Sequence, residues 1–137
     1  MPHDPEFIAE TRSWLLKAHT DIRLAEIVQR EDASLYGDAL FHCQQAAEKS
    51  LKGFLTWHGR TFRKTHSIGE LGQAVVEIAP NISTSVRPAA VLTEYAWKFR
   101  YPGDVPEVAA EEIEAALQLA RSLYGAIVAA LPVDVHP

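Results

Sequence analysis

The sequence predicts an all-α protein, an up-and-down antiparallel bundle of about five helices. Apolar residues recur at spacings of three and four over long stretches, as on the buried face of an amphipathic helix. No stretch alternates apolar and polar positions with the β-branched residues and flanking turns that strands require. Short connections join the longest helical stretches, and this favours antiparallel packing of sequence neighbours.

The composition is that of an ordinary globular protein. With 137 residues, 47% hydrophobic and 23% charged, the chain is predicted to form one domain over 1–137, with an ordered core at about 4–131. The N-terminus carries no apolar leader, and no apolar run reaches the roughly 18 residues of a membrane span, so we expect a cytoplasmic protein without membrane contact. The net charge of −5 argues against nucleic-acid binding by the whole surface.

The first predicted helix starts at Asp4, whose side chain can cap the free amides ahead of Pro5, and runs to about Arg30. Its inward stripe is predicted to hold Ile8, Thr11, Trp14, Leu15, Ala18, Ile22, Ala25 and Val28, with Asp21 largely off it. A connection over 31–34 follows, with Ser34 as the expected cap of the next helix.

The second predicted helix spans 35–57, where no proline interrupts the helical spacing. Gly59 is placed to end it in a left-handed turn. Gly53 costs helix stability, which predicts that another backbone passes close to it. The single cysteine, Cys43, lies inside this helix and is expected to behave as a small core residue.

The third predicted helix begins at a capping box formed by Ser67 and Glu70 and ends before Pro80. A polar turn over 81–87 follows, with Ser83 or Ser85 as the cap of a fourth helix. Its inward residues are predicted to be Val91, Leu92, Tyr95, Ala96 and Phe99.

The run from Tyr101 to Asp104 is expected to break the fourth helix, because it contains a proline and a glycine. A last helix is predicted over about 106–131, stopped by Pro132. Acids at its start, including Glu107 and Glu111, favour a solvated face over acid–base chemistry.

Common enzyme signatures are missing from the sequence. No GxxxxGK[ST] loop and no GxSxG motif occurs, so nothing in the sequence indicates a P-loop phosphate-binding protein or a serine hydrolase of the GxSxG type. The histidines have neither HExxH spacing nor a cysteine pair beside them, so neither a metal site nor a cofactor is predicted.

The charges are distributed unevenly. Between residues 49 and 66 the chain carries five cations and no acid, whereas between 104 and 114 it carries five acids and no base. The cations are Lys49, Lys52, Arg60, Arg63 and Lys64. A basic corner on an acidic body can hold an anionic ligand or an RNA backbone, and it can equally be a solvated helix end and loop.

A further polar feature lies inside the second predicted helix. Gln44 and Glu48 are one turn apart on the stripe that should face other helices. Because a buried carboxylate needs a cation or several donors, we expect Arg100 or Lys49 to pair with Glu48. Such a pair can be purely structural, fixing the register of the helices.

Four segments, in order, resemble successive signatures of the HEPN domain family of nucleotide-binding helical domains. They are the stretch from Trp14 to Ala18 with Asp21, the stretch from Tyr36 to Gly53, the stretch from Lys64 to Leu71, and the stretch from Phe99 to Asp104. The resemblance covers nearly the whole chain. It implies an up-and-down bundle that forms a homodimer, often encoded beside a minimal nucleotidyltransferase in prokaryotic toxin–antitoxin or defence pairs.

The resemblance also bears on activity. The resemblance implies the chemistry of the many HEPN proteins that are metal-independent ribonucleases, in which an arginine and a histidine, separated by four to six residues at the start of a late helix, meet across the dimer. Arg100 matches the family arginine, but no histidine follows it at that spacing. His66 is the remaining candidate for a group that exchanges protons near neutral pH.

Three hypotheses follow. The first is a nucleotide- or RNA-binding module in which Arg100 and Lys49 contact phosphate, Lys52, Arg63 and Lys64 add charge, and Tyr101 stacks on a base. The second is an endoribonuclease toxin that uses Arg100 with His66 across a dimer. The third is a protein-interaction module whose polar cluster only sets the register of the helices.

Overall fold

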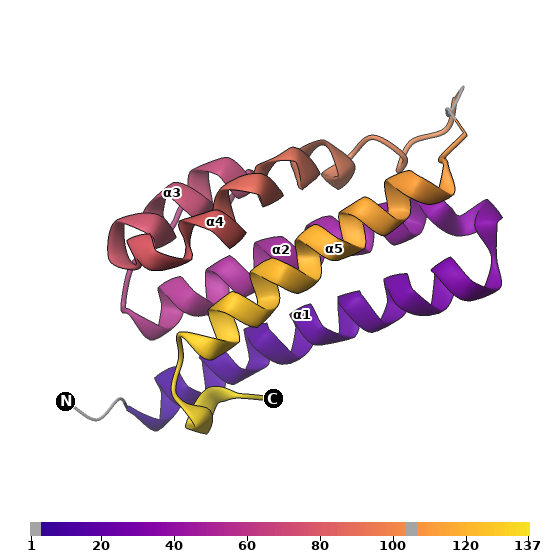
Figure 1. Ribbon diagram of the computed structural model, residues 1–137. Coiled ribbons are helices and arrows are strands. Elements are labelled where there is room, and N and C mark those ends of the chain that lie inside the picture. Colours follow the sequence, from indigo (N-terminus) through magenta and orange to yellow (C-terminus); the bar gives the residue numbers. More distant parts are fainter. Residues whose placement is uncertain (1–3, 104–106) are drawn as a thin grey trace.

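The computed structural model describes residues 4–103 and 107–137, and in these ranges the protein is all-α, without strands, as predicted. Three long helices form the body: α1 (Pro5–Glu31), α2 (Tyr36–Trp57) and α5 (Ala110–Ala129). Figure 1 shows them side by side, with α1 and α2 antiparallel and the two chain ends at the same end of the bundle.

A second layer covers α2 and α5. It consists of α3 (Ile68–Ile78), the single turn α4 (Ser83–Val86) and the 3₁₀ helix η3 (Arg87–Ala96), all on one side of the bundle in Figure 1. Short 3₁₀ turns, η1 (Ala33–Leu35), η2 (Pro80–Ile82) and η4 (Val133–Val135), complete the described elements.

The contact between α1 and α2 is the most extensive in the fold. Asp4 caps α1, as predicted, by accepting a hydrogen bond from the Glu6 amide at 2.9 Å. A Cβ added to Gly53 would lie 3.1 Å from Trp14 Cβ and 3.3 Å from Leu15 Cδ2, so this glycine lets α1 approach α2. The close approach predicted at Gly53 is confirmed.

The start of α2 differs from the prediction. Ser34 does not cap the helix, whose N-cap residue is Leu35 and has no side-chain hydrogen bond. The Asp32 carboxylate instead accepts bonds from the amide and hydroxyl of Ser34, at 3.0 and 2.6 Å, and organises the turn η1. At the other end Gly59 has φ +65°, which confirms the left-handed turn that ends α2.

Half of the capping box at α3 is present. The Ser67 hydroxyl accepts from the Glu70 amide at 3.1 Å, but the Glu70 carboxylate accepts from Arg63 instead of returning to Ser67. The Ser67 amide donates to the Thr65 hydroxyl at 3.0 Å. The helix therefore starts where predicted, with a different partner for its first amide.

The fourth helix is the main departure in secondary structure. Its first turn has no side-chain cap, so neither Ser83 nor Ser85 has the predicted role. Most of its length is 3₁₀, in which residues three apart eclipse one another, so Val86, Ala89, Leu92 and Tyr95 form the buried stripe. Val91 was predicted to face inward on α-helical spacing and is instead 64% exposed.

The last helix begins at Ala110, later than the predicted start near 106, and Asp104 and Pro106 themselves lie outside the described residues. The chain packs against the bundle beyond residue 131, because Val135 in η4 is fully buried and Arg12 donates to the Asp134 carbonyl. The N-terminal half of α1 therefore contacts the C-terminal end of the chain.

Candidate functional site

One face of α2 carries a polar network that includes two buried carboxylates. Asp21 comes from α1 and Glu48 from α2, and each residue is only 5% exposed. Both lie among helices whose other buried residues are mostly apolar. Each carboxylate is satisfied by a histidine and a lysine, in two adjacent groups.

The first group is centred on Glu48. Its Oε1 lies 2.7 Å from His66 Nδ1 and accepts from Gln44 Nε2 at 3.0 Å, while its Oε2 accepts from Lys52 Nζ at 2.8 Å. Gln45 Nε2 in turn donates to Gln44 Oε1 at 2.8 Å. Four side chains of α2 and one from the following loop thus form a continuous chain of hydrogen bonds.

The second group is centred on Asp21. Its Oδ1 lies 2.8 Å from His42 Nδ1, and its Oδ2 accepts from Lys49 Nζ at 2.7 Å. His42 and Lys49 are seven residues apart, so they lie on the same face of α2 about two turns apart. Asp21 therefore clamps α1 to two successive turns of α2.

The Glu48 partners keep its carboxyl ionised. Burial alone would raise the pKa of Glu48, but the hydrogen bonds from Lys52, Gln44 and His66 outweigh it and hold the pKa below its ordinary value. A carboxylate can only accept, so His66 Nδ1 carries the proton in this contact.

His66 is held at two points and still reaches solvent. Its carbonyl accepts from Gln44 Nε2 at 3.2 Å, and its side chain is anchored on Glu48 while 61% exposed. The other ring nitrogen, Nε2, makes no hydrogen bond with a described residue. A carboxylate that fixes the tautomer of an exposed imidazole is an arrangement suited to proton transfer.

Arg100 lies over the same helix, further toward its N-terminus. Its Cζ is 4.4 Å from the centre of the Phe41 ring, a cation–π contact. Phe41 and Glu48 share a face of α2 at a separation of seven residues, which is about 10 Å along the helix axis. Arg100 and His66 thus flank one face of α2, at different levels.

The predicted partner of Glu48 is wrong. Neither Arg100 nor Lys49 pairs with it, because Lys49 is taken by Asp21 and Arg100 by the Phe41 ring. Lys52, one turn along α2, and His66, from the loop that follows, provide the contacts instead.

Most of the predicted basic corner is paired with acids. Arg63 contacts Glu70 at 2.5 Å and Arg60 contacts Glu77 at 3.5 Å, in addition to the pairs of Lys49 and Lys52. Lys64 is exposed, and Tyr101 is 71% exposed beside Arg100 in sequence. The groups left to meet a ligand are therefore the exposed edges of His66, Arg100, Lys64 and Tyr101.

Asp21 and His42 belong to the polar network although the sequence pattern does not predict them as site residues. That pattern placed Asp21 off the inward stripe of α1, yet the residue lies three positions after Ala18 and four before Ala25, both fully buried. That spacing places Asp21 at the edge of the buried stripe of α1. A charged residue at such an edge was the feature of the sequence that could have indicated a buried ion pair.

Two further properties of the described residues limit the kinds of site. Over 4–103 and 107–137, no group of three or more histidine, cysteine or acidic side chains is arranged to hold a metal ion. In the same ranges no helix combines the length and the apolar character needed to cross a membrane.

The chain is therefore a small antiparallel helical bundle that carries a polar network on its second helix. The model of the HEPN domain matches residues 11–130, and the chain belongs to this family. It is similar to the crystal structure of TT1696 from Thermus thermophilus, with 27% sequence identity and a TM-score of 0.72. The similarity covers 89% of this chain and 98% of the Thermus chain. Comparison with curated proteins gives no match.

Proposed function

We propose that the chain is a nucleotide- or RNA-binding module that holds a phosphate backbone along the exposed edge of α2. The observation that carries the proposal is the placement of Arg100 and His66 over one face of this helix. Lys49 pairs with Asp21 and Lys52 pairs with Glu48, so Arg100, which lies on the Phe41 ring, adds a positive charge that neither carboxylate neutralises. Family membership supports the same ligand class.

The spacing of the two groups favours binding over cleavage within one chain. The residues that anchor them on α2, Phe41 and Glu48, are about 10 Å apart along the helix axis, which favours contacts to different phosphates. Contacts to successive phosphates of one strand fit this spacing. Tyr101, exposed next to Arg100, is then positioned to stack on a base.

The finer roles follow from the site. Arg100 and Lys64 contact the phosphates of the bound RNA strand directly. Lys49, Lys52 and Arg63 are already paired with carboxylates and contribute mainly through long-range electrostatic attraction. We further propose that the protein acts as a homodimer and as the partner of a minimal nucleotidyltransferase in a prokaryotic toxin–antitoxin or defence pair.

Binding of a fluorescent single-stranded RNA over a range of salt concentrations tests the proposal. We expect Arg100→Gln and Lys64→Gln each to weaken binding and to reduce the slope of log K against log salt by about 0.7 per lost phosphate contact. Arg23→Gln, on exposed α1 surface, is the matched control and should leave the slope unchanged. Absence of binding by the unaltered chain, or an equal effect of all three variants, contradicts the proposal.

A second candidate function, metal-independent RNA cleavage, is favoured by the Glu48–His66 contact. His66 Nε2 would take the proton of a ribose 2′-hydroxyl, the 2′-oxygen would attack phosphorus, and the departing 5′-oxygen would take a proton from water. The products are a 2′,3′-cyclic phosphate and a free 5′-hydroxyl. Arg100 of a second copy would supply the charge that stabilises the transition state.

Incubation with a mixed RNA pool in the presence of a chelator decides between the two functions. Cleavage that His66→Ala abolishes and His19→Ala preserves supports the ribonuclease. Intact RNA with the unaltered chain, at concentrations that saturate binding, excludes cleavage and leaves the binding function.

A further inference from the structure

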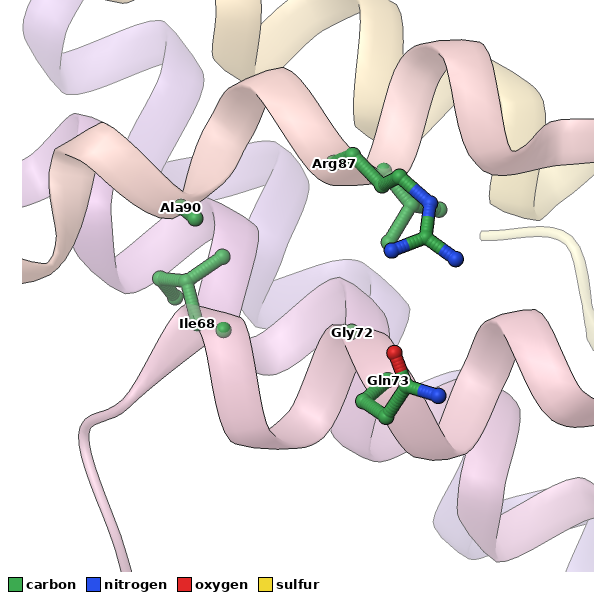
Figure 2. Close-up of a pocket in the computed structure, with 7 residues that line it drawn as sticks. Ile68, Gly72, Gln73, Arg87 and Ala90 are labelled. Carbon is green, nitrogen blue, oxygen red and sulfur yellow. The ribbon is translucent and has the colours of Figure 1, made fainter.

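A small cavity opens between α3 and the α4–η3 segment, away from the polar face of α2 (Figure 2). Its volume is about 130 Å³. The residues that line it take no part in the proposed function. Its walls come from two short helical segments that face each other across the groove.

The floor of the cavity is apolar, and two of the wall positions are glycines. A Cβ on Gly69 would lie 4.0 Å from Ala90 Cβ and 3.8 Å from Ser67 Oγ, at ordinary contact distance, so this glycine faces Ala90 on the opposite wall. A Cβ on Gly72 would lie 2.9 Å from Val86 Cγ1, so this glycine permits the two walls to approach. Ile68 and Val86 are each 1% exposed, which fixes the shape of the floor.

The rim carries two polar side chains at one end. Figure 2 shows Arg87, from the upper segment, and Gln73, from α3, projecting on the same side, while Ile68 and Ala90 lie at the other end. Arg87 and Gln73 are exposed, and the side chain of neither makes a hydrogen bond or ion pair with another described residue. A guanidinium and an amide are thus available beside an apolar hollow.

We propose that this cavity binds a small branched aliphatic carboxylate. An apolar cavity of about 150 Å³ accepts a ligand as large as benzene, so a volume of this order fits roughly four to six carbons. The aliphatic group would lie in the cavity between the wall of Gly69 and Gly72 and the wall of Val86 and Ala90. The carboxylate would lie at the rim, where the planar guanidinium of Arg87 can donate two parallel hydrogen bonds and Gln73 a third.

The charge and the size of the site together select this ligand. An inorganic anion would satisfy Arg87 but leave the hollow empty, and a neutral hydrocarbon would fill the hollow but gain nothing from Arg87. Only a molecule with both parts uses the whole site.

Titration of the full chain with 4-methylpentanoate, followed by the amide NMR signals of Gly69 and Gly72, tests the proposal. We expect saturable shifts with a Kd on the order of 1 mM, as befits so small a ligand. The neutral isostere 4-methylpentanamide should bind roughly 10-fold more weakly, since it loses the charge-assisted bonds. N-acetyl-leucine separates a free acid from a chain terminus: tighter binding of this probe overturns the assignment to a free acid.

Two variants and two matched controls complete the experiment. Arg87→Gln should weaken binding about 10-fold, as the amide isostere does, and Gly69→Leu should abolish it by filling the hollow. Arg23→Gln and Gly125→Leu make the same exchanges at exposed sites elsewhere and should bind normally. Arg87 is exposed, so Arg87→Gln tests the site even if Gly69→Leu fails to fold. Unshifted Gly69 and Gly72 signals, or unchanged affinity in Arg87→Gln, overturn the proposal.

Discussion

His66 Nδ1 lies 2.7 Å from Glu48 Oε1, so a largely exposed imidazole is anchored on a carboxylate from the packed interior. The same carboxylate accepts from Lys52 and Gln44. The loop after α2 is thereby tied to the helix before it. Glu48 is both the centre of the candidate site and a structural element, and the two roles are separable by experiment.

Replacing Glu48 by glutamine should destabilise the fold by about 2–3 kcal/mol, because Lys52 is left with an unpaired charge in a mostly buried position. Urea unfolding followed by circular dichroism measures the change. Glu77→Gln breaks the exposed contact to Arg60 and should leave the unfolding midpoint unchanged within error. Equal midpoints for all three proteins would show that the Glu48 network is not stabilising.

The stabilisation from Glu48 should depend on pH. Its folded-state pKa lies below the ordinary value of 4.5, so the stabilisation is fully present above that value and is lost as the pH falls through the folded pKa. The free energy of unfolding should therefore fall more steeply below about pH 5 in the unaltered chain than in Glu48→Gln. Parallel profiles from neutral pH to about pH 3 would contradict the lowered pKa.

Gly53→Ala should destabilise the protein despite the higher helix propensity of alanine. The new methyl group would meet Trp14 Cβ at 3.1 Å, and a Cβ cannot rotate away, so α1 must move. We expect a net loss of about 1 kcal/mol, since overpacking costs more than the propensity gains. Gly125→Ala is the control: nothing lies within 4 Å of the added atom, so this change in α5 should stabilise by up to about 1 kcal/mol. Stabilisation by both changes would show that the α1–α2 contact is loose.

Cys43 should be unreactive in the folded protein. Burial raises the pKa of its thiol to about 12, and the residue is fully buried in α2. Ellman's reagent at pH 8 should therefore label the chain only at the rate of unfolding, and should label one thiol at once in denaturant. Immediate labelling of the native protein would contradict the packing described around Cys43.

The periodicity of apolar residues predicted the helices well where they are long. The bounds of α1 and α2 follow from Asp4, Gly59 and an uninterrupted spacing of three and four, all of which are local signals. Periodicity failed over residues 87–96, because a 3₁₀ helix repeats every three residues and turns Val91 outward. Periodicity also failed to predict the burial of Asp21. A residue at the edge of an apolar stripe is buried or exposed depending on how the neighbouring helix packs.

In the polar network of α2, the burial of two residues was predicted correctly, but the partner of the buried carboxylate was not. Gln44 and Glu48 were expected to be buried, and they are. The partner of Glu48 was wrong because the pairing depends on how the loop containing His66 folds back over α2, a long-range event that spacing along one helix does not report.

By itself the sequence determined the helical class, the caps at Asp4 and Ser67, and the family to which the chain belongs, because these depend on short-range spacing and residue type. Only the tertiary structure decided which acid meets which base. Asp21 joins His42 and Lys49, and Glu48 joins Lys52 and His66, through contacts that span up to 28 residues of chain. The physical reason is that a buried charge takes whatever donors the packed helices and loops bring within reach, and packing alone sets that choice.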